Sequence, residues 1–298
     1  MPFLSVYGTK IHYRWEGKNE GKVLILLHGW SASIPWWTRV MPTLSQEYRL
    51  LLIDLPGHGR SSSLPIQLCE KPIVAMSSIL HSIINTLEIQ KPVLVGWSLG
   101  GMVSLQYVLD YPKTLSALIL VDTSAVGKIM PSYGFLPQIP YYCIPDLKKF
   151  LPLIRMQLLV SEKLLTSINK MPIRQSVAML LVNLLAAGKK PDKNLVAWAT
   201  EILLQDLNIG ALLQMAIGTL LYYDVVDRLH EVDIPTLIIH GREDRFLSLG
   251  VAELLQRKIR GSKLTVIDGV GHCPHLEKPK EFTKEVIAFL NKLTSSFQ

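Results

Sequence analysis

The sharpest sequence signal for the fold lies at residues 93–104, which read VLVGWSLGGMVS. Its first half is apolar and β-branched, which predicts a buried strand, and its second half predicts a helix. Between them Gly96-Trp97-Ser98-Leu99-Gly100 matches Gly-x-Ser-x-Gly, in which a serine occupies a strained turn and its flanking positions must lack a β-carbon. The segment therefore predicts a nucleophile elbow with Ser98 as the nucleophile.

Strand-like and helix-like segments alternate on both sides of this turn. The strand-like runs are 23–27, 49–53, 93–96, 118–121, 236–240 and 264–267, and the helix-like segments are 42–46, 73–87, 99–111, 248–258 and 281–293. The first residues alternate like a strand pair that turns at Gly8-Thr9. This pattern is typical of an α/β fold, a mostly parallel sheet flanked by helices on both faces.

The alternation stops between residues 126 and 225. This stretch contains only helix-like segments, at 147–159, 173–187, 195–204 and 209–221, after a Pro-rich loop. We expect residues 1–125 and 226–298 to form one α/β core, and residues 126–225 to form an inserted all-helical cap, or lid.

Two later segments supply a base and an acid for Ser98. HGREDRF places Asp244 just after the strand-like run 236–240, and VIDGVGHCPHLEKP places His272 just after 264–267. Because carboxyl ends of parallel strands share one edge of a sheet, both residues should lie near Ser98. The order serine, acid, histidine matches the order that such a fold requires. Glu243 fits the spacing from Gly241 less well than Asp244, and Asp122 is the fallback acid.

The segment LILLHGW ends an upstream strand and predicts half of an oxyanion hole. The backbone N–H groups of Trp30 and of Leu99, at the start of a helix, are the expected pair of donors.

His28 is expected to be structural. In DLPGHGRS, Asp54 and Ser61 should tie the loop around His58 through bonds to the backbone. His275 should pack locally, and His12, His81, His230 and His240 are interpreted as ordinary positions.

Composition excludes several classes of function. The 298 residues include only 3 cysteines, far apart, which argues against a disulfide framework and a zinc site. No cluster with metal-ligand spacing and no phosphate-cradling loop occurs, so no cofactor is implied. The start lacks a basic leader with an apolar core, and the apolar stretch 177–187 is too short to cross a bilayer. We therefore expect a cytoplasmic protein without a transmembrane segment.

Five ordered motifs together resemble the α/β-hydrolases over essentially the whole chain. They are HGW at 28–30, DLPGHGRS at 54–61, GWSLGG at 96–101, GREDRF at 241–246 and GVGHCPHLEKP at 269–279. Serine rather than aspartate at position 98 argues against the epoxide hydrolase and haloalkane dehalogenase branches. Within the serine branch, HGW and GWSLGG are similar to the carboxylesterases of biotin synthesis, which cleave pimeloyl-acyl-carrier-protein methyl ester.

Nearly all of the net charge of +7 lies in the expected lid. Residues 146–193 hold nine cations and three anions, a balance of +6. A basic lid could dock an acidic acyl carrier protein, with Lys148, Lys149, Arg155 and Arg174 as candidate contacts. Solvated helix faces would give the same pattern, and an anionic membrane surface, contacted peripherally, is the rival partner. Nucleic acid is not expected, because no binding motif accompanies the charge.

These features favour a serine carboxylesterase that acts on a medium-length or hydrophobic acyl group. The expected catalytic residues are Ser98, Asp244 and His272. The candidates for the substrate pocket are Trp30, Trp97, Leu151, Leu158 and Leu180. Two alternatives remain, because a fold does not determine a substrate. One is hydrolysis of a carbon–carbon bond or a lactone by the same triad, and the other is a ligand receptor or scaffold.

Overall fold

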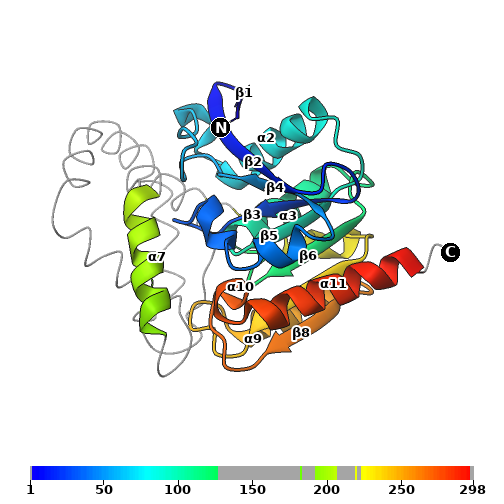
Figure 1. Cartoon of the computed structure of the whole chain (residues 1–298). Coiled ribbons are helices and arrows are strands. Elements are labelled where there is room, and N and C mark those ends of the chain that lie inside the picture. The colour runs from blue at the N-terminus through cyan, green and yellow to red at the C-terminus, as the bar shows by residue number, and fades with distance from the viewer. Residues whose placement is uncertain (1, 127–181, 183–191, 207–218, 220–222, 296–298) are drawn as a thin grey trace, which may run out of the picture.

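The computed structural model describes residues 2–126, 182, 192–206, 219 and 223–295 (Figure 1). Eight strands form one sheet in the order β1-β2-β4-β3-β5-β6-β7-β8. Their bounds are β1 Phe3–Val6, β2 Thr9–Gly17, β3 Val23–Leu27, β4 Arg49–Ile53, β5 Val93–Trp97, β6 Ala117–Val121, β7 Thr236–Gly241 and β8 Lys263–Ile267. β2 pairs antiparallel with β1 and β4, and all other neighbours are parallel.

The central strands are apolar along their whole length because helices cover both faces of the sheet. β5 and β6 are buried at every position, as expected for parallel strands between two helical layers. The helices have the bounds α1 Met41–Leu44, α2 Pro72–Thr86, α3 Leu99–Asp110, α9 Leu249–Lys258, α10 Pro274–Glu277 and α11 Pro279–Ser295. α3 contacts α2 and β5, whereas α11 contacts α1 and β7. Figure 1 shows α11 crossing one face of the sheet and α2 and α3 on the other.

The α/β fold class expected from the sequence is confirmed. All six expected strands and all five expected core helices are present, and their ends differ from the expected ones by at most two residues. The N-terminal pair is also present, but it turns one residue earlier than expected. Tyr7 and Gly8 form the turn, both with positive φ (46° and 77°), and Thr9 already belongs to β2.

The expected lid lies almost entirely outside the described residues. Its described helix is α7, Lys193–Asp206, which contains the expected segment 195–204. Val126 and Asp224 form an isolated antiparallel bridge, so the chain leaves the core and returns to it at neighbouring points between β6 and β7. Trp198 of α7 lies 6.5 Å, between ring centroids, from the core residue Trp36.

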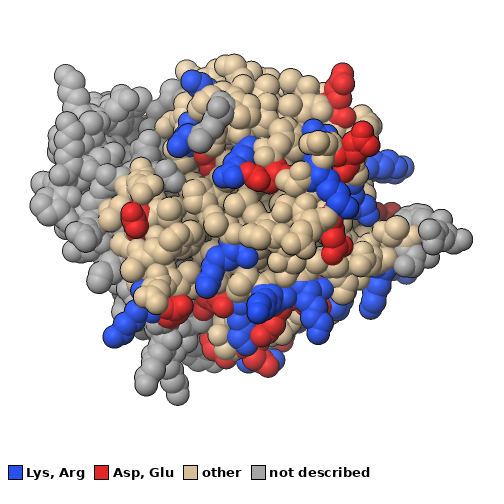
Figure 2. Space-filling model, viewed as in Figure 1, with Lys and Arg blue, Asp and Glu red and all other residues tan. Residues whose placement is uncertain are grey.

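The described surface of the core carries charges of both signs. In Figure 2, blue and red side chains are interspersed on the visible face. Several are paired, such as Lys263 with Glu285 at 2.8 Å and Lys278 with Glu281 at 3.2 Å. Within the described part of the chain, no helix is long and apolar enough to cross a membrane.

Candidate active site

Ser98 occupies the turn between β5 and α3 in a strained backbone conformation. Its φ and ψ are 52° and −112°, in a region that residues with a side chain rarely adopt. A β-carbon at Gly100 would collide with the carbonyl group of Leu27, and one at Gly96 would collide with Gly100. Backbone strain of this kind persists where the surroundings enforce it, and it is concentrated at functional sites.

Bonds to the end of β6 hold the elbow in place. The N–H of Ser98 donates to the carbonyl of Val121 at 2.9 Å, and the hydroxyl of Thr123 donates to the carbonyl of Ser98 at 2.6 Å. The side chain of Ser98 is partly exposed, whereas the flanking Trp97 and Leu99 are buried. The structure therefore presents the serine hydroxyl at the carboxyl edge of the sheet.

The structure brings together the three side chains expected to be catalytic. The hydroxyl Oγ of Ser98 lies 2.9 Å from Nε2 of His272, and Nδ1 of His272 lies 2.7 Å from Oδ2 of Asp244. The other oxygen of Asp244 accepts the N–H groups of Phe246 at 2.7 Å and Leu247 at 3.0 Å. An Nδ1–H tautomer of His272 would donate to Asp244 and leave Nε2 free to accept the serine proton.

Asp244 is held as a carboxylate although it is buried. Burial alone would raise its pKa, but the charge and hydrogen bond of His272 outweigh that effect and lower the pKa. The backbone N–H of Leu247 acts in the same direction. An ionised Asp244 therefore orients His272 and would stabilise its protonated form. Glu243, the weaker candidate, instead accepts the N–H of Val270 at 2.9 Å.

The two expected oxyanion donors lie at the start of α3 (Leu99) and in the loop after β3 (Trp30). Leu99 is the first residue of the 12-residue helix α3, whose first N–H groups have no acceptor within the helix. The N–H of Gly100 donates to the carbonyl of His28 at 3.1 Å, which ties the start of α3 to the loop that carries Trp30. A helix N-terminus next to a second backbone donor suits a negative charge on oxygen.

His28 and the loop after β4 have the structural roles expected of them. Nδ1 of His28 donates to the carbonyl of Gly29 at 2.8 Å, and Nε2 accepts the N–H of Leu55 at 2.9 Å. The Asp54 carboxylate accepts the N–H groups of Ile34 and Arg60, and the Ser61 hydroxyl donates to the carbonyl of Asp54. His12, an ordinary position by sequence alone, donates from Nδ1 to Asp54 at 2.7 Å and is buried with it.

Trp97, a pocket candidate, packs beneath the triad. It is only 1% exposed, stacks on Trp36 with ring centroids 5.3 Å apart, and donates from Nε1 to the carbonyl of His272 at 2.6 Å. The indole thus holds the backbone of the histidine loop, a role that the motif alone did not reveal. Trp30, the other described pocket candidate, is partly exposed.

We expect Trp97→Phe to lower the free energy of unfolding by about 1–3 kcal/mol more than Trp37→Phe. Both substitutions remove a buried indole, but the N–H of Trp97 bonds His272, whereas that of Trp37 has no partner among the described residues. Chemical denaturation of the two variants measures the difference. Equal losses would show that the bond to His272 contributes nothing to stability.

His275 packs locally, as expected, in an aromatic cluster. It is 0% exposed, and its ring centroid lies 4.6 Å from that of Trp37 and 4.7 Å from that of Trp97. Neither ring nitrogen has a hydrogen-bond partner among the described residues. Burial lowers the pKa of His275 to about 3, and it does the same for His58.

These buried neutral histidines predict an acid-sensitive fold. Their folded-state pKa is about 3, below the ordinary value of 6.5, so the unfolded chain binds the proton more readily. The free energy of unfolding should fall between pH 6.5 and 3, by up to about 1.4 kcal/mol per pH unit for each histidine. In His275→Phe this slope should be shallower by up to that amount. Denaturation curves measured from pH 7 to pH 4 test this, and parallel profiles would contradict it.

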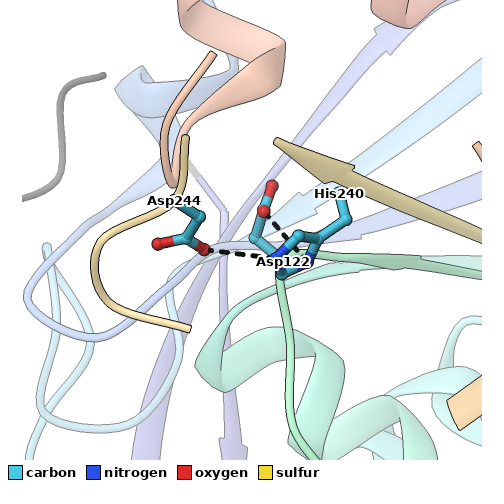
Figure 3. A group of neighbouring side chains, drawn as sticks. All are labelled: Asp122, His240 and Asp244. Carbon is cyan, nitrogen blue, oxygen red and sulfur yellow. Dashed lines mark ion pairs between the residues drawn. The ribbon is translucent and has the colours of Figure 1, made fainter. Parts of the chain in front are cut away.

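Sequence reasoning missed one cluster behind the triad. Asp122, the fallback acid, and His240, an ordinary position by sequence alone, lie beside Asp244 and are buried with it (Figure 3). Each side chain offers one nitrogen or oxygen atom that could bind a metal ion, and these three atoms lie within 4.8 Å of one another. The sequence feature that could have revealed this cluster is the position of His240 near the carboxyl end of β7, because the triad assembles at that edge of the sheet.

The remaining candidates lie outside the described residues. They are Leu151, Leu158 and Leu180 for the pocket, and Lys148, Lys149, Arg155 and Arg174 for docking. Their roles stay predictions.

The fold and the site geometry define an α/β hydrolase. A family model described as the alpha/beta hydrolase fold matches residues 22–279, and the chain belongs to this family.

Among curated proteins, the chain is 26% identical over 277 residues to a pimeloyl-[acyl-carrier protein] methyl ester esterase of Nitrosomonas europaea, covering 92% of this chain and 97% of that protein. It is 28% identical over 278 residues to the esterase of the same name from Aeromonas salmonicida, with 91% and 96% covered. The solved esterase from Exiguobacterium antarcticum shares the fold, with a TM-score of 0.76, 24% identity, and 97% and 98% covered. The family and these curated relatives identify the class of the chain as that of ester-bond hydrolases.

Proposed function

We propose that the chain is a serine carboxylesterase whose catalytic residues are Ser98, His272 and Asp244. The observation that carries this proposal is the unbroken chain of contacts from the Ser98 hydroxyl through His272 to Asp244, at 2.9 and 2.7 Å. A serine hydroxyl is a weak nucleophile, and it needs an adjacent base that a third group orients. This arrangement supplies each of those groups.

The reaction would proceed through an acyl-enzyme. His272 takes the proton of Ser98 while Oγ attacks the acyl carbon, and the N–H groups of Trp30 and Leu99 bind the oxygen that becomes negative. His272 then gives the proton to the leaving alcohol. In the second half, His272 activates water, which attacks the acyl carbon, and the released acid leaves Ser98 protonated again.

The finer proposal is that the substrate is a methyl ester of a pimeloyl chain carried by an acyl carrier protein. Two curated relatives bear the name of that esterase and align over more than nine-tenths of this chain. An excess of six cations in residues 146–193 leaves the rest of the chain nearly neutral. Acyl carrier proteins are acidic, so a basic segment would steer one toward the site.

We also propose that residues 126–225 form a lid over the site. The bridge between Val126 and Asp224 supports an insertion at this point of the fold. The contact of Trp198 with Trp36 supports the placement of α7 near the triad, because Trp36 in turn stacks on Trp97. A lid of this kind would choose the acyl group that reaches Ser98.

The test compares one acyl group in two forms, pimeloyl methyl ester on acyl carrier protein and free dimethyl pimelate. For Lys148→Glu/Lys149→Glu/Arg155→Glu, we expect the ratio of kcat/KM on the carrier-bound ester to that on the free ester to fall by about 10-fold or more. The matched control, Arg257→Glu/Lys258→Glu/Lys284→Glu, reverses three charges on the core and should leave the ratio unchanged. An unchanged ratio in the first variant would reject docking through these residues.

Faster turnover of a lactone or a vinylogous diketone than of either ester would reject the substrate class.

A further inference from the structure

A second pair of an acid and an imidazole lies directly behind the triad. His240 is on β7, Asp122 follows the end of β6, and Asp244 is in the turn after β7 (Figure 3). Nδ1 of His240 lies 3.2 Å from Oδ1 of Asp122, and its Nε2 lies 3.9 Å from Oδ2 of Asp244. All three side chains are 0% exposed, so no bulk water can compensate their charges.

The hydrogen bonds of His240 imply a second proton, between its Nδ1 and the Asp122 carboxyl group. Its Nε2 lies 3.1 Å from the carbonyl of Leu247, an acceptor only, so Nε2 carries a hydrogen. In the neutral ring, Nδ1 then carries a lone pair, and it lies 3.2 Å from Oδ1 of Asp122. An ionised carboxylate there would set two lone pairs against each other in a dry site. One proton between the two atoms removes that conflict.

A metal ion does not fit this cluster as well as a proton does. Both oxygens of Asp244 are engaged, by His272 and by the N–H groups of Phe246 and Leu247. Oδ1 of Asp122 accepts the N–H of Gly241 at 2.9 Å. Within this cluster, Oδ2 of Asp122 and Nδ1 of His240 are the side-chain atoms that make no hydrogen bond to a described residue, and two such atoms are fewer than the three or four protein ligands of a zinc site.

The surrounding charges decide which group keeps the proton. Burial raises the pKa of Asp122 well above its usual range, and the negative charges of Asp244 and Glu277 add to that effect. Burial lowers the pKa of His240 despite the attraction of Asp244, and His272 lowers it further. The nearby Cys273 thiol has a pKa raised by burial and stays neutral. The proton therefore belongs on Asp122, next to a neutral His240 and an ionised Asp244.

The backbone at Asp122 supports a functional constraint at this position. Its φ is 38°, in the left-handed region that aspartate adopts more readily than most residues, although at a cost. Its N–H donates to the carbonyl of Ile239 at 3.0 Å, which fixes it against β7. The strained residue is thus the one whose carboxyl group faces His240.

We propose that Asp122, as a neutral carboxylic acid that donates its proton to Nδ1 of His240, is a positioning residue for the proposed esterase site. His240 in turn donates from Nε2 to the carbonyl of Leu247, and the N–H of Leu247 holds Asp244. This relay fixes the turn that carries the triad acid, and it leaves Asp244 as the buried anion next to His272. The catalytic part of the proposal rests on the proposed function.

The direct test is nitrogen NMR of wild-type protein labelled with ¹⁵N-histidine, with His240 assigned by its loss in His240→Gln. At pH 7 we expect His240 to be the neutral Nε2–H tautomer. A doubly protonated His240 would mean that Asp122 is ionised and would overturn the proposal. This measurement needs neither activity nor a folded Asp122 variant, so it decides the protonation state even if the proposed function fails.

Activity of two variants tests the positioning role. Asp122→Ala should lower kcat about 10- to 100-fold with KM within about threefold, because a small displacement of Asp244 misaligns His272. Asp122→Asn, which is neutral and carries a hydrogen-bond donor, should restore kcat to within about threefold of wild type. The pH at which kcat/KM falls on the acid side of its pH profile, the acid limb, should stay unchanged. Asp54→Asn, which disrupts the other buried pair of an aspartate and a histidine, is the control and should lower Tm without moving that limb.

Two results would contradict the positioning role. If Asp122→Ala lowers Tm but keeps wild-type kcat, Asp122 is merely structural. If Asp122→Asn shifts the acid limb downward by about half a pH unit or more, Asp122 carries a negative charge in the wild-type protein, and its carboxyl group is not neutral. Loss of all activity in Ser98→Ala together with either result would leave the proposed function intact and reject this inference alone.

Discussion

Replacing Ser98 by alanine is expected to abolish ester hydrolysis and leave the fold intact. The substitution removes the atom that attacks the acyl carbon, and His272 then has no hydroxyl to activate. Removal of a triad serine lowers kcat by about 10⁴-fold or more, and only catalysis by oxyanion stabilisation and binding remains. Alanine lacks the hydroxyl but keeps the β-carbon, so the strained turn and its bonds to Val121 and Thr123 should persist.

The assay uses p-nitrophenyl esters of graded chain length, and Tm is measured alongside. Ser78→Ala is the matched control, because its hydroxyl donates to the carbonyl of Val74 within α2 and plays no part in the site. It should retain wild-type kcat. Equal rates for Ser98→Ala and wild type would reject Ser98 as the nucleophile.

Replacing Asp244 by asparagine is expected to lower kcat by about 10³- to 10⁴-fold, with a smaller effect on KM. The amide cannot accept the Nδ1–H of His272 as a carboxylate does, and its own N–H group favours the opposite tautomer of the imidazole. His272 would then present a hydrogen, not a lone pair, to Ser98. The variant also loses the negative charge that stabilises the imidazolium formed in the reaction.

Glu243→Gln is the matched control for Asp244→Asn. It makes the same change from carboxylate to amide one residue away, and the glutamine oxygen can still accept the N–H of Val270. Its kcat should stay within about threefold of wild type, the range expected when no triad bond is altered. If Glu243→Gln loses more activity than Asp244→Asn, the acid has been assigned to the wrong residue.

The sequence predicts the α/β core well because periodicity and turn chemistry determine it locally. Continuous apolar runs such as 23–27 can form buried parallel strands only where helices cover both faces. The order of Ser98, Asp244 and His272 along the chain then determines their meeting point, since parallel strands end at one edge. The contacts at 2.9 and 2.7 Å confirm that these side chains meet there.

The supporting residues could not be predicted in the same way. Contacts such as that of Trp97 with the carbonyl of His272, or of His240 with Leu247, join side chains to backbone atoms that no spacing rule relates. The state of Asp122 depends on burial and on two neighbouring carboxyl groups, which appear only when the ends of β6 and β7 are placed side by side. Tertiary packing, not local pattern, creates these features.

Covalent labelling tests whether His272 activates the hydroxyl group of Ser98. A fluorophosphonate probe reacts with an activated serine, and peptide mass spectrometry of the labelled protein identifies the residue. We expect one label per chain, on the peptide that contains Ser98, and none on Ser98→Ala. A native protein that takes up no label, or takes it up on another serine, would show that Ser98 is not an activated nucleophile.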